Sequence, residues 1–264
     1  MTPIDIHWIL LALVLSAVFA WVAYLLRFLN ASGSVAAAVL GTVILGTQGW
    51  TWVLPLLAFF VSSSLLSKLR AMVRGEFEEA RGASRDAVQV LANGSAAGIM
   101  ALADAVLGVN LYPGYLGALA AAAGDTWSTE IGLIWGRRPR RITNFEPVPA
   151  GTSGGITLPG LLGALLGAFL IAMTGFFAAV ETVASSIIIL ITAAGFSGSV
   201  VDSLLGATVQ GRLRCQVCGR LTERKTHCAA ATRSVGGCKW LNNDGVNAAA
   251  TTFGALLSLA LIYG

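Results

Sequence analysis

Two carboxylates stand inside a stretch of chain that otherwise has the composition of a membrane span. Asp125 and Glu130 belong to the segment Gly-Asp-Thr-Trp-Ser-Thr-Glu, which follows a run of alanines. An ionisable side chain in hydrocarbon costs at least about 2.5–3.5 kcal/mol, so such a residue normally faces a polar cavity and serves function. Asp202 lies ten residues before Arg212, much as Asp125 lies twelve before Arg137, and the helical rise places both aspartates at a similar depth. We therefore predict that Asp125, Glu130 and Asp202 are catalytic.

Oxygen-bearing side chains elsewhere in the chain point to a Mg²⁺ site. Asn243 and Asn247 are spaced i, i+4 at the start of the last apolar run, with Asp244 beside them, and Asn93 lies at a comparable depth in an earlier run. Oxygen ligands without imidazoles suit Mg²⁺, which binds through one or two carboxylates together with substrate phosphates. The predicted Mg²⁺ ligands are Asp125, Asp202 and Asp244.

A basic loop after the acidic segment has the residue types of a phosphate site. It carries Arg140 and Arg141 and continues into Gly-Thr-Ser-Gly-Gly at 151–155, a turn able to present consecutive N–H groups to an anion. For this feature taken singly, a plain flexible loop is the equal alternative. The predicted nucleotide- and phosphate-binding residues are Lys68, Asn93, Arg140, Arg141, Thr152, Ser153, Gly154, Gly155, Asn243 and Asn247. We add the hypothesis that the helix breaks at Gly124 and Gly132, which bracket the acidic segment.

All four cysteines fall between residues 211 and 240, as Cys215-x-x-Cys218, Cys228 and Cys238. Four soft ligands so close together suit a closed tetrahedral Zn²⁺ site that folds a loop without a hydrophobic core. His227 is the alternative ligand, and unligated or redox-active cysteines are the alternative to a metal.

Composition identifies an integral membrane protein. Of 264 residues, 56% are hydrophobic and 11% charged, with a mean hydropathy of +0.76. The sequence predicts an all-α polytopic membrane bundle formed by one transmembrane domain over 1–264, with a cysteine-bearing cytoplasmic loop at 211–240 before the last span. About eight spans are expected, at 8–27, 33–48, 50–67, 87–110, 113–135, 158–180, 183–206 and 246–263.

The basic residues predict the orientation of these spans. They cluster after the third, fifth and seventh spans, so the positive-inside rule makes those loops cytoplasmic and puts both termini outside. This topology also accounts for the net charge of +4 better than nucleic-acid binding does. The residues concerned are Lys68, Arg70, Arg74, Arg81, Arg85, Arg137, Arg138, Arg140, Arg141, Arg212, Arg214, Arg220, Arg224, Lys225, Arg233 and Lys239.

Seven ordered motifs resemble those of the DUF92 integral membrane family, which contains the plant phytyl-phosphate kinases and the animal transmembrane protein 19. They begin at Ser32-Gly33-Ser34, Phe59-Phe60-Val61, Gln89-Val90-Leu91, Gly124-Asp125-Thr126, Val148-Pro149-Ala150, Asp202-Ser203-Leu204 and Asn243-Asp244-Gly245.

The resemblance implies a kinase that extends a prenyl monophosphate, such as phytyl or geranylgeranyl phosphate, to the diphosphate with CTP or another nucleoside triphosphate and Mg²⁺. The acidic block and basic loop also resemble the phytol kinase and dolichol kinase group, which phosphorylates a free alcohol. A nucleotidyltransferase that makes a CDP-lipid, and a transporter of a phosphorylated lipid or ion, remain alternatives.

Overall fold

The computed structural model describes residues 6–74, 84–179, 185–219, 221–222 and 226–264. Eight long α-helices lie within these residues: α1 (Ile6–Leu25), α2 (Ala31–Gln48), α3 (Trp50–Arg74), α5 (Ala87–Leu107), α6 (Tyr112–Trp135), α7 (Leu158–Ala178), α8 (Ser186–Thr208) and α9 (Asn243–Tyr263). Arg81, Arg220, Arg224 and Lys225, together with the junction of the predicted sixth and seventh spans, lie outside the described residues.

The predicted all-α membrane bundle is confirmed, and the helices occur where spans were expected. Seven of the described helices are long and apolar enough to cross a membrane, and α6 is long but is not among them. Its Ala, Gly, Ser, Thr and carboxylate side chains lower its hydropathy. The helix α3 runs to Arg74, past the predicted end at residue 67.

Helix α6 is the centre of the bundle and packs against α3, α5, α7, α8 and α9. Every residue from Tyr112 to Gly124 is buried, and most of them are alanine or glycine, whose small side chains let neighbouring helices approach closely. The helix is continuous from Tyr112 to Trp135. The hypothesis of a break at Gly124 and Gly132 is therefore wrong: a Cβ on Gly124 would lie 3.1 Å from the Ala164 carbonyl oxygen, so this glycine serves close helix packing.

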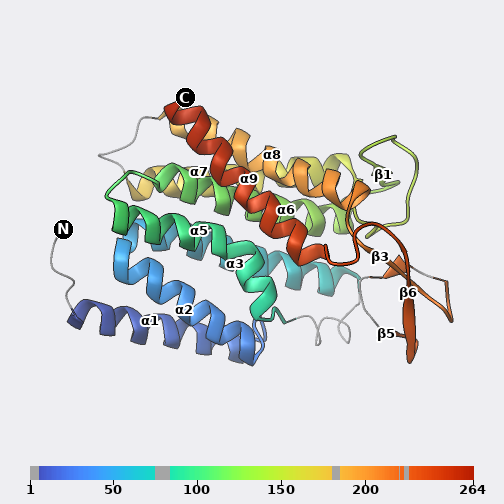
Figure 1. The fold of residues 1–264 in the computed structure, drawn as a ribbon, viewed down its shortest axis with the longest axis horizontal. Coiled ribbons are helices and arrows are strands. Elements are labelled where there is room, and N and C mark those ends of the chain that lie inside the picture. Colours follow the sequence, from blue (N-terminus) through green and yellow to red (C-terminus); the bar gives the residue numbers. More distant parts are fainter. Residues whose placement is uncertain (1–5, 75–83, 180–184, 220, 223–225) are drawn as a thin grey trace.

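The helices alternate in direction, so the start of α1 and the end of α9 lie at one end of the bundle and the strands at the other, the loop-bearing end (Figure 1). The loops after α3, α6 and α8 therefore lie on one side, as the positive-inside argument requires of the predicted basic loops. Which end faces the cytoplasm stays a prediction.

Four helices begin at the loop-bearing end, namely α2, α5, α7 and α9, and each has a side-chain cap. The caps are Asn30, Asp86, Thr157 and Asn242, which accept hydrogen bonds from the N–H groups of Gly33, Gln89, Gly160 and Gly245. A helix N-terminus carries partial positive charge, and the C-termini of α1, α3, α6 and α8 at the same end carry partial negative charge, so the preference of this end for anions depends on its basic side chains.

Two small antiparallel sheets form the loop-bearing end. Strands β1 (Arg140–Arg141) and β2 (Gly155–Ile156) pair in the loop between α6 and α7. Between α8 and α9, the strands β3 (Arg212–Cys215), β4 (Leu221–Thr222), β5 (Thr226–His227) and β6 (Ala230–Gly236) form a sheet of order β4-β3-β6-β5. The sequence predicted a loop here but not its strands, because the polar and cysteine-rich segment has no clear apolar alternation.

The packing of α6 predicts different outcomes for two glycine-to-alanine changes. A Cβ on Gly117 would overlap the Gly254 carbonyl oxygen and the Ser258 side chain, whereas a Cβ on Gly46 would find its nearest atoms at 3.8 Å. Gly117→Ala should therefore destabilise the detergent-solubilised protein by about 1–3 kcal/mol, as overpacked cores do. Gly46→Ala should be neutral or stabilising, because alanine favours helix. Equal unfolding temperatures for the two variants would contradict the α6–α9 packing.

Candidate functional site

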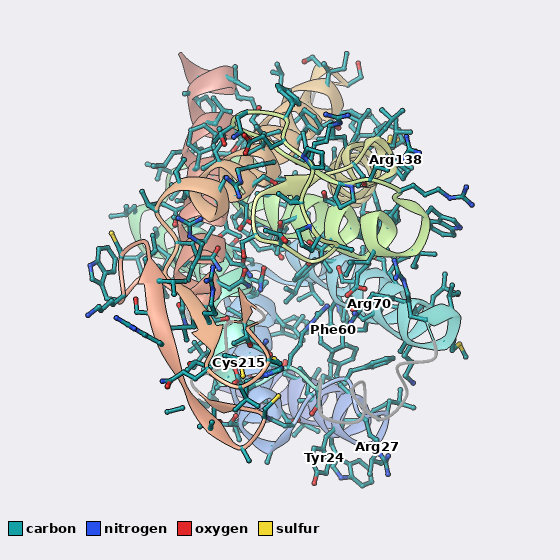
Figure 2. All side chains as sticks on the ribbon, turned by 90° about the vertical axis from the view of Figure 1, so that its right-hand side faces the viewer. Tyr24, Arg27, Phe60, Arg70, Arg138 and Cys215 are labelled. Carbon is teal, nitrogen blue, oxygen red and sulfur yellow. The ribbon has the colours of Figure 1, made fainter. Side chains whose placement is uncertain are left out.

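A polar cavity of about 1010 Å³ opens at the loop-bearing end, lined by α3, α5, α6, α8, α9 and the adjoining loops. This volume is at the upper end of the roughly 300–1,000 Å³ typical of ligand sites. Figure 2 looks onto this end of the molecule, with Arg70 in the right half of the view and Cys215 in the left half. Twelve of the predicted site residues line the cavity: Lys68, Asn93, Asp125, Glu130, Thr152, Ser153, Gly154, Gly155, Asp202, Asn243, Asp244 and Asn247.

The aspartates predicted to share a depth are neighbours. The carboxyl groups of Asp125 on α6 and Asp202 on α8 lie within hydrogen-bonding reach of each other. The Asn247 amide, oriented with its nitrogen toward these oxygens, donates to Asp202 Oδ2 at 2.9 Å and to the Asn243 carbonyl oxygen at 3.3 Å. Two carboxylates side by side repel each other when both are ionised, and a bound cation removes that repulsion. Their oxygen atoms are the donors that Mg²⁺ prefers.

Glu130 is held on another side of α6 by groups from α3. Its Oε2 lies 2.7 Å from Arg70 Nε, and its Oε1 accepts a 2.7 Å hydrogen bond from Ser67. Five residues along a helix turn the direction of the side chain by about 140°, so Glu130 and Asp125 face different walls of the cavity. The carboxylate of Glu130 therefore fixes the position of Arg70. A direct catalytic role for Glu130 stays a prediction.

Two further cations at the cavity contact aromatic rings. Lys68 Nζ lies 4.4 Å from the centre of the Phe28 ring, and the Arg85 guanidinium lies 5.9 Å from that of Phe60. Burial lowers the pKa of Arg85 below its usual range, and the negative charge of Glu130 raises it in part. An arginine stays charged nonetheless. Since an aromatic ring attracts a cation without neutralising it, these charges remain able to bind an anion.

The backbone of Arg85 is fixed by two hydrogen bonds. Its N–H donates to the Phe28 carbonyl oxygen at 3.0 Å, and its own carbonyl oxygen accepts from Asn30 N–H at 3.1 Å. A Cβ on Gly33 would overlap that carbonyl, so glycine is required where α2 meets the segment before α5. The start of α2 thus positions a cavity cation that lies 52 residues later in the chain.

Arg140 and Arg141, predicted to bind phosphate, do not line the cavity, so their binding of phosphate stays a prediction without support from the cavity. They form β1, whose pairing with β2 folds the loop back on itself. Arg140 Nη1 donates to the Phe145 carbonyl oxygen at 2.8 Å, and Arg141 Nη1 lies 4.0 Å from Glu146 Oε2.

The glycine turn of the same loop reaches the cavity but is not an open anion nest. Gly155 N–H already donates to the Thr152 carbonyl oxygen at 2.9 Å. Gly154 has a φ of +74° and packs so closely on Ala207 of α8 that a Cβ would collide with it. The turn therefore closes one side of the cavity against α8.

A second, apolar cavity of about 220 Å³ lies between α1, α2, α3 and α5. Its walls include Phe19, Leu40 and Phe60, and it shares Arg85, Gln89 and Asn93 with the polar cavity. The polar cavity thus adjoins the apolar one. A ligand with a polar head and an apolar tail would need two such neighbouring cavities.

Sequence reasoning missed several cavity residues, above all Arg70 and Arg85, which entered only the charge argument for topology. A signal existed: a carboxylate in a membrane helix needs a cationic partner, and Arg70 was available for Glu130. Asp104, the carboxylate of α5, lies away from the cavity. It accepts hydrogen bonds from Gln48 at 2.9 Å and from Leu111 N–H at 2.8 Å, at the opposite end of the bundle.

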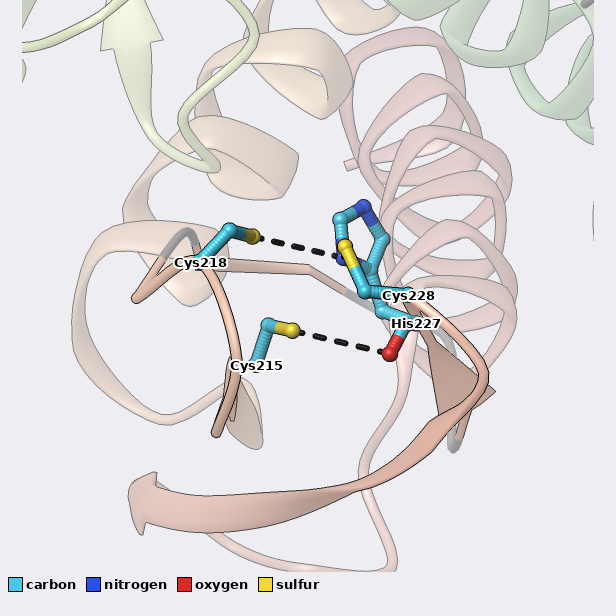
Figure 3. A group of neighbouring side chains, drawn as sticks. All are labelled: Cys215, Cys218, His227 and Cys228. Carbon is cyan, nitrogen blue, oxygen red and sulfur yellow. Dashed lines mark hydrogen bonds between the residues drawn. The ribbon is translucent and has the colours of Figure 1, made fainter.

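The cysteine-bearing sheet brings together Cys215, Cys218, His227 and Cys228, whose ligand atoms all lie within 4.8 Å of one another (Figure 3). The group includes His227, the predicted alternative ligand, and does not include Cys238. The reason is its position beyond β6, where Cys238 N–H donates to the Val209 carbonyl oxygen at 2.8 Å.

The thiols of this group have shifted pKa values. Hydrogen bonds, first from the Cys218 backbone and then from that of Val217, lower the pKa of the Cys215 thiol to about 6. Contact with the Cys218 side chain, together with burial, raises the pKa of Cys228 to about 11.

Comparisons with known proteins place this arrangement in a family. The model described as "Integral membrane protein DUF92" matches residues 14–255. Protein PGR of Arabidopsis thaliana is 32% identical over 97% of this chain and 96% of its own, and an uncharacterized membrane protein of Methanocaldococcus jannaschii is 33% identical over 90% and 87%. The chloroplastic Protein VTE6 of Arabidopsis thaliana is 27% identical over 88% of this chain, which spans 65% of that relative. No solved structure matches the chain.

The Arg70–Glu130 pair predicts a large loss of stability when one partner is removed. Glu130→Ala leaves a largely buried guanidinium without its carboxylate and should lower the free energy of unfolding by about 3 kcal/mol. The matched control is Glu146→Ala, which breaks an exposed pair with Arg141 and should change stability by less than about 1 kcal/mol. Chemical unfolding in detergent, followed by tryptophan fluorescence, measures both. Similar losses for the two variants would argue against a buried ion pair.

Proposed function

Because this chain belongs to the integral membrane protein family DUF92, we propose that its polar cavity transfers the γ-phosphate of CTP, or another nucleoside triphosphate, to an isoprenoid monophosphate. The observation that carries the proposal is the meeting of three environments at one place. A pair of aspartates, a set of fixed cations and an apolar groove all adjoin the same chamber. The family resemblance to prenyl-phosphate kinases supports the same reaction.

The aspartates fit a Mg²⁺ ion that arrives with the nucleotide. Asp125 and Asp202 would hold it, with Asp244 at the start of α9 as a further oxygen donor and Asn247 keeping the Asp202 carboxylate in place. When bound, the ion would offset negative charge on the triphosphate. No histidine or cysteine lines this cavity among the described residues, which favours a hard cation.

In this proposal the cations of the cavity bind phosphate oxygens. Lys68 and Arg85 bring positive charge from α3 and from the segment before α5, and Glu130 holds Arg70 in a fixed orientation beside them. Phosphoryl transfer depends mainly on such positioning and charge stabilisation.

The reaction needs no strong base. An anionic oxygen of the acceptor monophosphate attacks the γ-phosphorus of the nucleotide. The bond between that phosphorus and the oxygen bridging to the β-phosphate breaks, and its electron pair leaves with the nucleoside diphosphate. The product is a prenyl diphosphate. An alcohol acceptor would instead need a group to take its proton, for which Asp125 is the candidate.

The apolar cavity is the proposed site of the isoprenoid chain. Its junction with the polar chamber at Arg85, Gln89 and Asn93 lets the phosphate head reach the cations while the tail remains among aromatic and aliphatic side chains. We also propose that the loop-bearing end faces the cytoplasm, where the nucleotide is available.

Product analysis with purified protein, Mg²⁺, labelled CTP and geranylgeranyl phosphate tests the reaction. Appearance of the γ-label in a lipid diphosphate is the expected result. Transfer of CMP would identify a nucleotidyltransferase, and phosphorylation of the alcohol alone would identify a prenol kinase. Absence of turnover with both acceptors would favour a transporter.

Asp125→Asn should abolish this turnover and leave the protein folded, because the change removes a proposed metal-binding charge whose desolvation opposes stability. Glu146→Gln, on the loop outside the cavity, is the matched control and should retain the full rate. If Asp125→Asn kept more than about a tenth of the rate, a loss of under about 1.4 kcal/mol, the assignment of Asp125 would be wrong.

A second pair of variants tests the tail site. Ala37→Trp, on the wall of the apolar cavity, should raise KM for a C20 acceptor at least about tenfold, by roughly 1.4 kcal/mol of lost tail binding, and leave KM for CTP unchanged. Val35→Trp lies on the exposed face of the same helix and should change neither constant. A rise in the KM for CTP with Ala37→Trp, or no effect on the acceptor, would place the tail elsewhere.

A further inference from the structure

We propose that Cys215, Cys218, His227 and Cys228 bind one Zn²⁺ ion, and that this ion holds together the sheet formed by β3 to β6. The site lies apart from the polar cavity, and its existence does not depend on the proposed reaction.

Distances between the four side chains suit tetrahedral coordination. The Nδ1 atom of His227 lies 3.5 Å from Cys218 Sγ and 3.2 Å from Cys228 Sγ. With metal–sulfur and metal–nitrogen bonds of about 2.3 and 2.0–2.1 Å, tetrahedral geometry separates a sulfur from a nitrogen by about 3.5 Å. The four atoms therefore surround a volume of the size that a zinc ion requires, with three sulfurs and one nitrogen.

The first pair of ligands lies on a tight turn after β3. Val217 N–H donates to Cys215 Sγ at 3.4 Å, and Gly219 N–H donates to the Cys215 carbonyl oxygen at 3.1 Å. Gly219 has a φ of +73°, which lets the chain reverse directly after Cys218. Both sulfurs are thus presented on one side of the turn, and the N–H group stabilises the thiolate form that binds metal.

The second pair of ligands stands on a strained hairpin. β5 and β6 pair His227 with Ala230, which leaves Cys228 and Ala229 as a two-residue turn. Both have positive φ, 50° and 57°, although such a turn normally uses Asn or Gly. A left-handed conformation is unfavourable for a non-glycine residue, so something outside the turn must favour it. A bond from the Cys228 sulfur to a metal shared with β3 would supply that restraint.

The sheet has almost no hydrophobic core to replace a metal. Among the described residues between 211 and 240, Cys215 alone is buried. Small sheets without a core commonly depend on a disulfide or a structural metal. The four ligands come from both halves of the sheet, so a single ion would cross-link β3 to the β5–β6 hairpin.

The base of the sheet is joined to the polar cavity. Gln210, which lines the cavity, forms a parallel bridge with Cys238, and Gly211 N–H donates to the Leu241 carbonyl oxygen at 2.8 Å. These contacts tie the end of α8, which carries Asp202, to the start of α9, which carries Asn247. The proposed ion would therefore fix the distance between two helices that supply cavity residues.

Metal analysis of the purified full-length protein tests the site, with Cys238→Ser as matched control. The wild type and Cys238→Ser should each contain about one zinc per chain, and Cys218→Ser less than about a tenth of that. His227→Cys should keep the metal, because four thiolates also form a closed zinc site. Absence of zinc from the wild type, or an equal loss from Cys218→Ser and Cys238→Ser, would overturn the proposal.

Cobalt spectra identify the ligands independently of stability. Protein refilled with Co²⁺ should show the visible bands of a tetrahedral site with thiolate charge transfer, and His227→Cys should shift them toward those of four thiolates. Limited proteolysis supplies a structural readout: removal of zinc by a chelator should expose 211–238 to cleavage while the helices stay intact. A cobalt spectrum unchanged by His227→Cys would exclude the histidine, and unchanged cleavage would exclude the structural role.

Discussion

The close approach of backbones around α6 is the constraint on which the rest of the structure depends. Glycines from its neighbours meet its carbonyl groups: a Cβ on Gly163 would lie 2.8 Å from the Trp127 oxygen, and one on Gly167 would lie 2.7 Å from that of Ala123. In a membrane, such packing replaces the hydrophobic effect as the main source of helix association. Because the neighbours enclose α6, its carboxylates are shielded from lipid and open into a shared chamber. A larger side chain at these contacts would separate the walls of that chamber.

Much of the site follows from the sequence because helical rise is a fixed quantity. Counting from the first basic residue placed Asp125 and Asp202 at one depth, and the i, i+4 spacing placed Asn243 beside Asn247; all four line one cavity. Loops have no such period. The direction of Arg140 depends on the pairing of β1 with β2, which follows from tertiary contacts rather than from local spacing. His227, and not Cys238, lies beside the other three cysteines because of the register of the β5–β6 hairpin, which composition does not specify.

The pairing of Arg70 with Glu130 shows that a basic residue in a membrane protein can serve both topology and a local ion pair. Basic residues near the ends of spans orient the chain, and a count of them needs no knowledge of their contacts. Some of the same residues also neutralise carboxylates or bind anions, and that use depends on which helices become neighbours. α3 extends past its apolar segment to Arg74, and this extra length brings Arg70 to Glu130, beside Ser67 at the predicted end of the span. The C-terminal end of α3, which the hydropathy pattern does not include in the span, thus lines the polar cavity.

The apolar cavity reaches the outer surface of the bundle, because Leu15 and Trp50 on its wall are exposed on the faces of α1 and α3. A chain that enters there arrives by lateral diffusion within one leaflet. Its effective concentration is then a mole fraction of the surrounding lipid, not an amount per volume of water. Saturation would accordingly depend on how much detergent or phospholipid dilutes the acceptor, while the nucleotide, arriving from solution, would follow ordinary molar kinetics. The rate would therefore depend on the mole fraction of the acceptor in the lipid and on the molar concentration of the nucleotide in water.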